Sequence, residues 1–416
     1  MGGMESSTIP RLSDFHLSED RGFLSAEDPL EFLPPYFSPW VDLARDTPKL
    51  LETKQLRERV HKLPLLNHTR LRGQQEWYLA RVVLSMIGHA YVWQEGEAGV
   101  PDYLPRSVAV PWYRVSEHLG VPPIISHHCA SLVNWKKKDP NGPLELDNLQ
   151  LLFCITCPRD FAWFFLIPIQ IEMHFTPALP LLVQAQEGVL EGNSKLTKDA
   201  LTAMTPVLNK MKQTLGRMKE QCDPEVFYNQ FRYFLSGWKD NPALPHGLIY
   251  EGVSDKPFQF SGGSAAQVAT VQCLDEFLGI RHDDRPGAFL MRMRDYMLPD
   301  HRNFIAAVGK GPSVRNFVSN SDDQELRTAY NTCVSLLRDF RSLHIRIIAS
   351  YVIIPSKRAK GHKVEGLANV GTGGTGIMSF LKSVRDTTAA ALLPDVSGPT
   401  GNQHRGKEPI IPSSVN

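Results

Sequence analysis

Apolar residues recur at three- and four-residue steps along most of the chain, which is the spacing of one helix face. The clearest stripe consists of Leu79, Val82, Val83, Met86, Ile87 and Ala90. The same spacing predicts further helices over residues 147–154, 161–174, 199–222, 224–238, 268–279 and 286–297. Because the alternation typical of strands is scarce, the pattern predicts a mainly α protein.

Turn-forming residues divide this helical pattern into parts of unequal size. Residues 1–30 are polar and predict an N-terminal arm, and residues 31–123 predict a small helical domain with short β pieces. Two prolines within residues 119–125 mark the boundary to a larger, all-α domain over residues 124–393. The tail, residues 394–416, is rich in Pro, Gly and Ser and is expected to be disordered.

Composition places the chain among ordinary globular proteins. It has 416 residues, of which 42% are hydrophobic and 21% charged, and its net charge is +1. This balance gives no attraction for nucleic acid or a membrane surface, and the apolar runs near 161–171 and 345–354 are too short or interrupted to span a bilayer. Six scattered cysteines without a signal-peptide pattern predict reduced thiols and a cytoplasmic protein.

Cys154 and Cys157 have the spacing of a zinc-ligand pair, but no second pair accompanies them in the sequence. Structural zinc sites take four ligands, so structural thiols are the favoured interpretation of this motif over a metal site.

The longest predicted helix covers residues 321–354. Ser321 and Gln324 have the capping-box pattern at its start, and Pro355 is expected to stop it. One apolar face carries Cys333, Leu337, Phe340, His344, Ile347, Ile348 and Tyr351. An imidazole in the middle of such a face costs free energy unless its nitrogens have partners. On spacing alone, a hydrogen-bonded core histidine is the commoner outcome, and a proximal haem ligand is the alternative.

Nine short motifs provide a second line of argument. They are QLRERV at 55–60, LPR with AVP at 104–111, NWKKKDP at 134–140, LSGWK at 235–239, YEG at 250–252, GGSA at 262–265, HRNF at 301–304, RSLH at 341–344 and GTGGT at 371–375. In this order and spacing, over nearly the whole chain, they make it similar to the indoleamine 2,3-dioxygenase family. The resemblance implies a two-domain, mainly helical haem protein in which His344 matches the proximal ligand of the iron.

The resemblance also implies roles around the haem. Asp275 and Arg341 match a carboxylate and an arginine on the proximal side, where they would orient the imidazole. An ordinary ion pair between helices is the alternative for these two. Phe164, Phe227 and Leu235 match the apolar distal pocket, with Phe227 against the substrate indole, although plain core residues would show the same sequence pattern.

Further matches concern the substrate. Arg232 matches the arginine that binds the substrate carboxylate, because a guanidinium can hold a carboxylate through two hydrogen bonds; a surface arginine is the alternative. Ser264 and Ala265 match a loop that passes the haem edge. The glycine-rich motif matches a mobile loop, expected near residues 357–376, that closes the site and places Thr372 near the substrate ammonium.

Three residues depart from the family pattern. Pro168 replaces a serine that is frequent on the distal helix, and proline has neither a hydroxyl nor a backbone N–H. Leu343 replaces an aromatic residue that often precedes the iron ligand. His127 stands where an aromatic residue is usual; it is either a hydrogen-bond donor to bound O₂ or, as the favoured interpretation, a partly exposed loop histidine.

The resemblance implies a dioxygenase that uses ferrous haem b and O₂ to open the indole C2=C3 bond of L-tryptophan, giving N-formylkynurenine in the kynurenine pathway of tryptophan catabolism. A reductant is then required, and a monomer is expected. Two alternatives stay open: an O₂ carrier resembling myoglobin, and a signalling or scaffold protein with weak activity. Arg232 and the 371–375 loop favour the enzyme, because a carrier needs no amino-acid clamp, whereas Pro168 and His127 favour the carrier.

Overall fold

The computed structural model describes residues 9–282, 284–358 and 376–394. Helices dominate these residues, so the prediction of a mainly α protein is confirmed. The α-helices are α1 (Ser38–Glu52), α2 (Leu56–His61), α3 (Gly73–Trp93), α4 (Arg106–His118), α5 (Pro158–Phe175), α6 (Ala178–Leu190), α7 (Ser194–Gly216), α8 (Pro224–Val226), α9 (Ala269–Phe277), α10 (Asp284–Arg294), α11 (Pro299–Lys310), α12 (Val314–Ser319), α13 (Gln324–Ile348), α14 (Ile354–Arg358) and α15 (Ile377–Ala390).

Shorter elements lie between these helices in the described residues. Three π-helical turns are η5 (His128–Leu132), η8 (Phe227–Phe231) and η11 (Ala349–Ile353), and the 3₁₀ turns include η1 (Leu12–Phe15), η9 (Arg232–Leu235) and η10 (Ala265–Gln267). Strand β1 (Tyr103–Leu104) pairs in parallel with β4 (Ile249–Tyr250). Strand β2 (Trp135–Lys137) pairs antiparallel with β3 (Leu149–Leu151).

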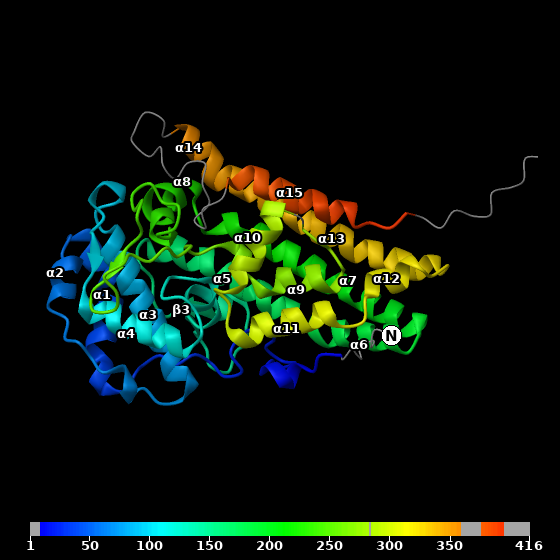
Figure 1. The fold of residues 1–416 in the computed structure, drawn as a ribbon, viewed down its shortest axis with the longest axis horizontal. Helices are drawn as coiled ribbons and strands as arrows, with labels where there is room; N and C mark the ends of the chain where they lie inside the picture. The colour runs from blue at the N-terminus through cyan, green and yellow to red at the C-terminus, as the bar shows by residue number, and fades with distance from the viewer. Residues whose placement is uncertain (1–8, 283, 359–375, 395–416) are drawn as a thin grey trace, which may run out of the picture.

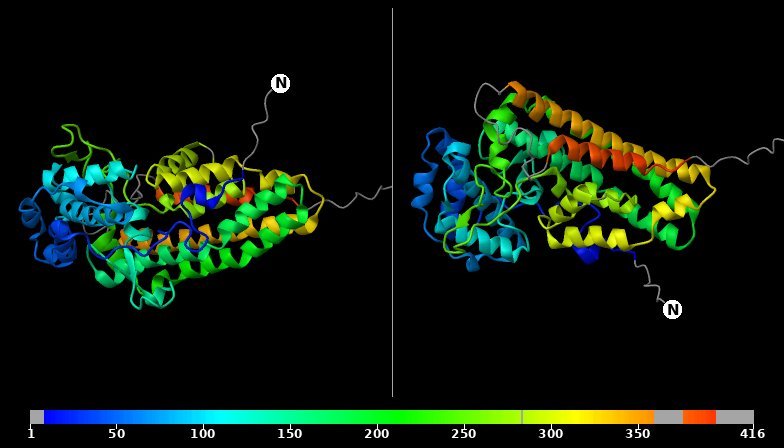
Figure 2. Two further views of the ribbon diagram at one scale, coloured as in Figure 1. Left: turned by 90° about the horizontal axis from the view of Figure 1, so that it is seen from below. Right: turned by 45° about the horizontal axis from the view of Figure 1, so that its top comes forward.

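The molecule is elongated, with α1–α4 gathered at one end and the long helices α7 and α13 running through the other (Figure 1). Helix α7 packs against α5, α6 and α13, and α15 lies along α13 (Figure 2). The domain boundary expected at residues 119–125 stays a prediction. The parallel pairing of β1 with β4 connects the two sides of that boundary.

The predicted stripe near the N-terminus lies in α3, in which every residue from 79 to 93 is buried. Helix α4 comes very close to it, because a Cβ on Gly88 would lie 2.4 Å from a ring atom of Trp112. Glycine is therefore required where these two helices cross. The pair forms the core of the end that contains α1–α4.

Two of the local predictions are wrong, and some helices were not predicted. Residues 147–154 are not helical, because β3 pairs with β2 and the Asn134 side chain bonds both backbone groups of Phe153. Residues 224–238 do not form one helix but pass from α8 into the turns η8 and η9. Helices α6, α11, α12 and α15 were not predicted.

The long helix is also bounded differently from the prediction. Asp323, not Ser321, caps α13 by accepting a hydrogen bond from the backbone N–H of Leu326 at 3.0 Å. Pro355 does not stop the rod, which continues through η11 into α14. The π turn η11 shifts the backbone hydrogen-bond register just before the proline. Pro355 then lies in the first turn of α14, a position at which a helix tolerates a residue without a backbone N–H.

One stretch, Pro158–Leu190, has the length and apolar composition of a membrane span, and 61% of its window is buried inside the fold. It covers α5 and α6 and includes the apolar run near residues 161–171, which was expected to be too short or too interrupted to span a bilayer. Core helices pass the same test, so this is a weak indication of a membrane.

Candidate active site

His344 lies near the C-terminal end of α13 and is partly accessible. No hydrogen bond involves its imidazole among the residues that the structure describes. Burial lowers the pKa of His344 to about 4, and the positive charge of Arg341 acts in the same direction. The ring is therefore neutral at neutral pH, which is the form that coordinates iron. A neutral imidazole without a partner suits a proximal haem ligand, and this role stays a prediction.

The structure brings together Asp275 of α9 and Arg341, which lies one turn before His344 on α13. Arg341 donates to Asp275 Oδ2 at 2.6 Å and to the hydroxyl of Thr388 on α15. His282 Nε2 lies 3.0 Å from the same carboxylate oxygen. These side chains join α9, α13 and α15 directly beside His344.

The Asp275 carboxylate is buried. Burial alone would raise its pKa, but the charge of Arg341 and the hydrogen bonds from His282 and Arg341 outweigh that effect and lower the pKa. Asp275 is therefore ionised at neutral pH. Its other oxygen, Oδ1, has no hydrogen-bond partner within the described part of the chain.

A cluster of aromatic rings packs against η11, the turn that continues α13. The rings of Phe164 and Phe227 have centroids 4.9 Å apart, and Phe227 meets the edge of Tyr351 at 5.7 Å. Phe231 contacts both phenylalanines. Tyr351 follows His344 by seven residues, which is about 10 Å along a helix axis and roughly the same face. The predicted apolar residues therefore lie close to the rod that carries His344.

Arg232 follows Phe227 by one π turn, because its backbone N–H donates to the Phe227 carbonyl. It is 3% exposed, so the surface-arginine alternative is wrong. Its guanidinium carbon lies 5.7 Å from the Tyr228 ring centroid. Burial lowers the pKa of Arg232 to about 10, while Tyr228 and Glu97 act in the opposite direction, so the side chain stays cationic at neutral pH.

The predicted haem-edge loop is tightly joined to Leu235. The N–H of Gly263 donates to the Leu235 carbonyl at 3.0 Å. A Cβ on Gly237 would lie 2.2 Å from the Gly262 nitrogen, so this crossing requires glycine. Ser264 begins η10 with a complete capping box, and Ala265 is exposed. The LSGWK and GGSA motifs are thus in direct backbone contact beside buried Leu235.

His127 is only 9% exposed, so the favoured interpretation as a partly exposed loop histidine is wrong. Its Nε2 lies 3.2 Å from Glu172 Oε1, and Thr270 donates to the other oxygen of that carboxylate. One ring nitrogen is thereby occupied, and a bond from His127 to O₂ stays a hypothesis. Pro168 lies inside α5 without ending it, four residues before Glu172.

Thr372 and the remainder of the 371–375 motif lie outside the described residues. The six cysteines are free thiols. Burial raises the pKa of Cys154 to about 11, and Cys157 Sγ lies 2.9 Å from Gln230 Oε1. No cluster of three or more metal-binding side chains occurs in the part of the chain that the structure describes.

Three residues around the site were missed in the sequence. Phe231 has the helical spacing of four from Phe227, which is a usable signal. Glu172 is a carboxylate in a strongly apolar helix, and such residues are buried only with partners. His282 gave no signal, because only the turn after α9 returns it to Asp275.

The amino-acid sequence of the chain is similar to those of several known proteins over most of its length. A family model described as indoleamine 2,3-dioxygenase matches residues 11–391. Indoleamine 2,3-dioxygenase 2 of Homo sapiens is 44% identical over 389 residues, covering 92% of this chain and 95% of the relative. Indoleamine 2,3-dioxygenase 1 of Rattus norvegicus is 44% identical over 390 residues, covering 92% and 96%. A myoglobin of Haliotis madaka is 36% identical over 382 residues, covering 91% and 98%.

Proposed function

The chain belongs to the indoleamine 2,3-dioxygenase family and is thus an oxidoreductase of the dioxygenase type, and we propose that it opens the indole C2=C3 bond of L-tryptophan with O₂ to give N-formylkynurenine. The observation that carries the proposal is Arg232, a buried cation one π turn from the aromatic cluster around Phe227. This combination suits an amino acid with an aromatic side chain.

His344 is the residue that would hold haem b, with the iron ferrous in the active form. When bound, the haem supplies the O₂ activation that protein side chains lack. The pair of Asp275 and Arg341 holds the face of α13 next to the imidazole against α9 and α15. These contacts support a fixed orientation of His344, as carboxylates near haem histidines commonly provide.

The distal residues bind and orient the substrate. The guanidinium of Arg232 would hold the tryptophan carboxylate through two hydrogen bonds. The rings of Phe164 and Phe227 would hold the indole and exclude water, which favours a fixed reactive geometry. No side chain is required as a general acid or base. Supply of electrons to the iron requires a reductant, and we infer a monomeric, cytoplasmic protein acting in tryptophan catabolism.

The direct test supplies the haem-loaded protein with a reductant, O₂ and L-tryptophan and follows N-formylkynurenine by its absorbance. Product formation is expected, and it should stop when O₂ or the reductant is left out. Retained haem without product would contradict the proposal.

A second candidate is an O₂-binding protein with little turnover, which the 36% identity to a Haliotis madaka myoglobin favours. The burial of Arg232 next to the aromatic cluster favours the enzyme, because a carrier has no amino-acid carboxylate to bind. Reversible O₂ binding with no consumption of L-tryptophan would support the carrier.

A further inference from the structure

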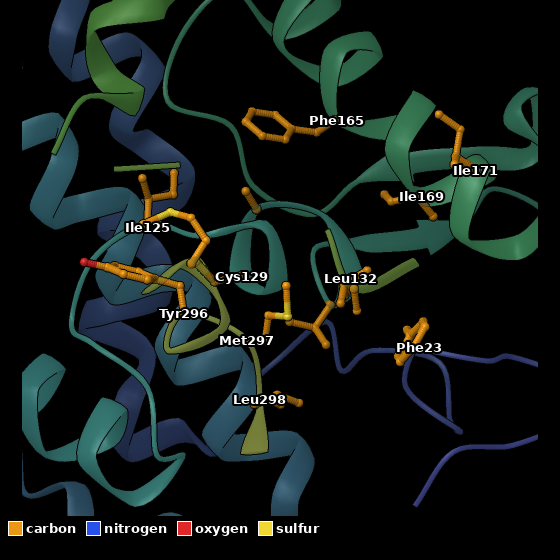
Figure 3. Packing of buried hydrophobic residues seen from close by; sticks show 14 of the residues in the cluster. Phe23, Ile125, Cys129, Leu132, Phe165, Ile169, Ile171, Tyr296, Met297 and Leu298 are labelled. Carbon is orange, nitrogen blue, oxygen red and sulfur yellow. The ribbon is translucent and has the colours of Figure 1, made fainter. Parts of the chain in front are cut away.

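A cavity of about 490 Å³ lies under the N-terminal arm, and its lining contains none of the residues assigned to the candidate active site, although His128 directly follows His127. Its walls come from the arm, the start of α3, the turn η5 and the start of α11, and include Phe15, Phe23, Tyr78, His128, Leu132 and His301. Figure 3 shows three of the apolar lining residues, Phe23, Leu132 and Leu298, from close by. The volume is that of an ordinary small-molecule site.

The N-terminal arm, which lines one side of this cavity, packs firmly against the rest of the protein. Phe15 meets the edge of the Phe304 ring at 5.5 Å, and Phe23 stacks on Phe175 at 6.3 Å. Gln75 of α3 donates to the Ser25 hydroxyl at 2.6 Å. The described part of the arm therefore has packing contacts and a hydrogen bond that keep the cavity walls in place.

The lining contains buried polar atoms without a hydrogen-bond partner in the described residues, Gln75 Oε1 and His128 Nε2. His301 is a further imidazole of the lining. It begins the HRNF motif, which the candidate active site does not use. It is 7% exposed, and no hydrogen bond involves it among the described residues. Burial lowers the pKa of His301 to about 3, with the charge of His127 acting the same way, so its neutral ring offers one donor and one acceptor. A buried polar group of this kind costs free energy until a ligand or water pairs with it.

The charge around the cavity is negative. Its lining contains three carboxylates, Glu27, Glu76 and Asp300, against the single guanidinium of Arg72. Asp300 Oδ2 also lies 2.9 Å from Nδ1 of His16, an exposed imidazole of the same lining. An excess of carboxylates attracts cations and repels anions. The aromatic walls Phe15, Phe23 and Tyr78 provide a surface for a flat ring, and their faces also attract cations.

We propose that this cavity binds a small aromatic amine in its protonated form, with the ring against the aromatic walls and the ammonium group near His301 and Asp300. The ammonium donates a hydrogen bond to the imidazole and is attracted by the carboxylates. This site is separate from the proposed dioxygenase site and does not depend on its activity.

The test measures binding of 2-phenylethylamine to the haem-loaded protein by calorimetry while the Soret band is recorded. One molecule should bind per chain without a Soret shift. The matched anion 3-phenylpropionate, which has the same ring and chain length, should bind at least about tenfold more weakly because of the carboxylates. Equal affinity for the two probes, or no heat at millimolar concentration, would show that the cavity holds only water.

Two variants connect the binding to the cavity. Asp300→Asn alters a partly exposed side chain and should weaken 2-phenylethylamine binding several-fold, and His301→Leu should weaken it further. Glu191→Gln, at an exposed carboxylate after α6, is the matched control and should leave the affinity unchanged. If His301→Leu fails to fold, Asp300→Asn still decides. An affinity that Asp300→Asn leaves unaltered would overturn the proposal.

Discussion

The two sides of the candidate active site differ in the kind of side chain that forms them: paired charged groups on one side and aromatic rings on the other. Beside His344, the ionised groups Asp275 and Arg341 are paired with each other and joined by His282 and Thr388. Around Phe227, aromatic rings contact one another, and the buried Arg232 follows one π turn later, with its guanidinium carbon 5.7 Å from the Tyr228 ring centroid. The difference indicates that the side beside His344 is held in place by hydrogen bonds among its own residues. The side around Phe227 and Arg232 suits the binding of a molecule that is apolar and has one anionic group.

The largest effect is expected from His344→Ala. If this imidazole is the axial ligand, the variant should retain little haem and lose the Soret band of the parent, while its far-ultraviolet circular dichroism is preserved. His246→Ala, at an exposed histidine, is the control and should keep full haem content. Stoichiometric haem with an unaltered Soret spectrum in His344→Ala would remove every role assigned around it.

The next effect tests the paired charges. Asp275→Asn leaves the buried guanidinium of Arg341 without its counter-ion, and should lower the free energy of unfolding by about 3–5 kcal/mol. Chemical denaturation measures this, with the exposed Asp295→Asn as control. The double variant Asp275→Leu/Arg341→Met should be more stable than Asp275→Asn, since no buried charge is left alone. A loss below about 1 kcal/mol in the single variant would contradict the importance of the pair.

The distal clamp is tested by Arg232→Ala. A hydrogen bond between charged groups contributes about 1.5–3 kcal/mol, so KM for L-tryptophan should rise roughly 10- to 100-fold. Tryptamine, which lacks the carboxylate, should show little change in the same assay. Arg232→Lys should lie between parent and alanine, because it keeps the charge but loses the two-pronged geometry. An equal rise for tryptophan and tryptamine would mean that Arg232 supports the pocket structurally.

The smallest effect is a difference in pH dependence. His89 of α3 lies 2.7 Å from the Phe234 carbonyl on η9 and accepts a hydrogen bond from Ile125 N–H, and thereby supports the turn that begins with Arg232. Burial lowers the pKa of His89 from 6.5 to about 3, against the effect of the Phe234 carbonyl. The unfolded chain then takes up a proton that the folded chain refuses, so stability is lost as the pH falls from about 6.5 towards about 3.

The His89→Gln variant should show a shallower dependence of unfolding free energy on pH over this window, by about one proton. The exposed His246→Gln is the matched control and should follow the parent. By contrast, the lowered pKa of Asp275 contributes stability that is lost only below its ordinary value of 3.8. Identical slopes for the parent and His89→Gln would show that this histidine is not held neutral.

Much of the fold could be predicted from local pattern. The stripe in α3 and the apolar face of α13 that carries His344 both follow from residues within a few turns of one another, and helical periodicity is a short-range property. The candidate residues followed from motif resemblance, which compares residue types in order along the chain. The structure places Phe164 against Phe227, and Arg232 one π turn after Phe227, although their roles stay predictions.

Other features depended on how distant segments cross. His282 reaches Asp275, Glu172 pairs with His127, and Gly237 crosses Gly262, although nothing local in the chain marks these pairs. The cavity beneath the arm likewise exists only because residues near the N-terminus cover α3 and α11. Periodicity along the chain reports which face of a helix is buried. Which face it meets is settled by packing and hydrogen bonding summed over the whole molecule, because many pairings satisfy each helix locally and few satisfy all of them at once.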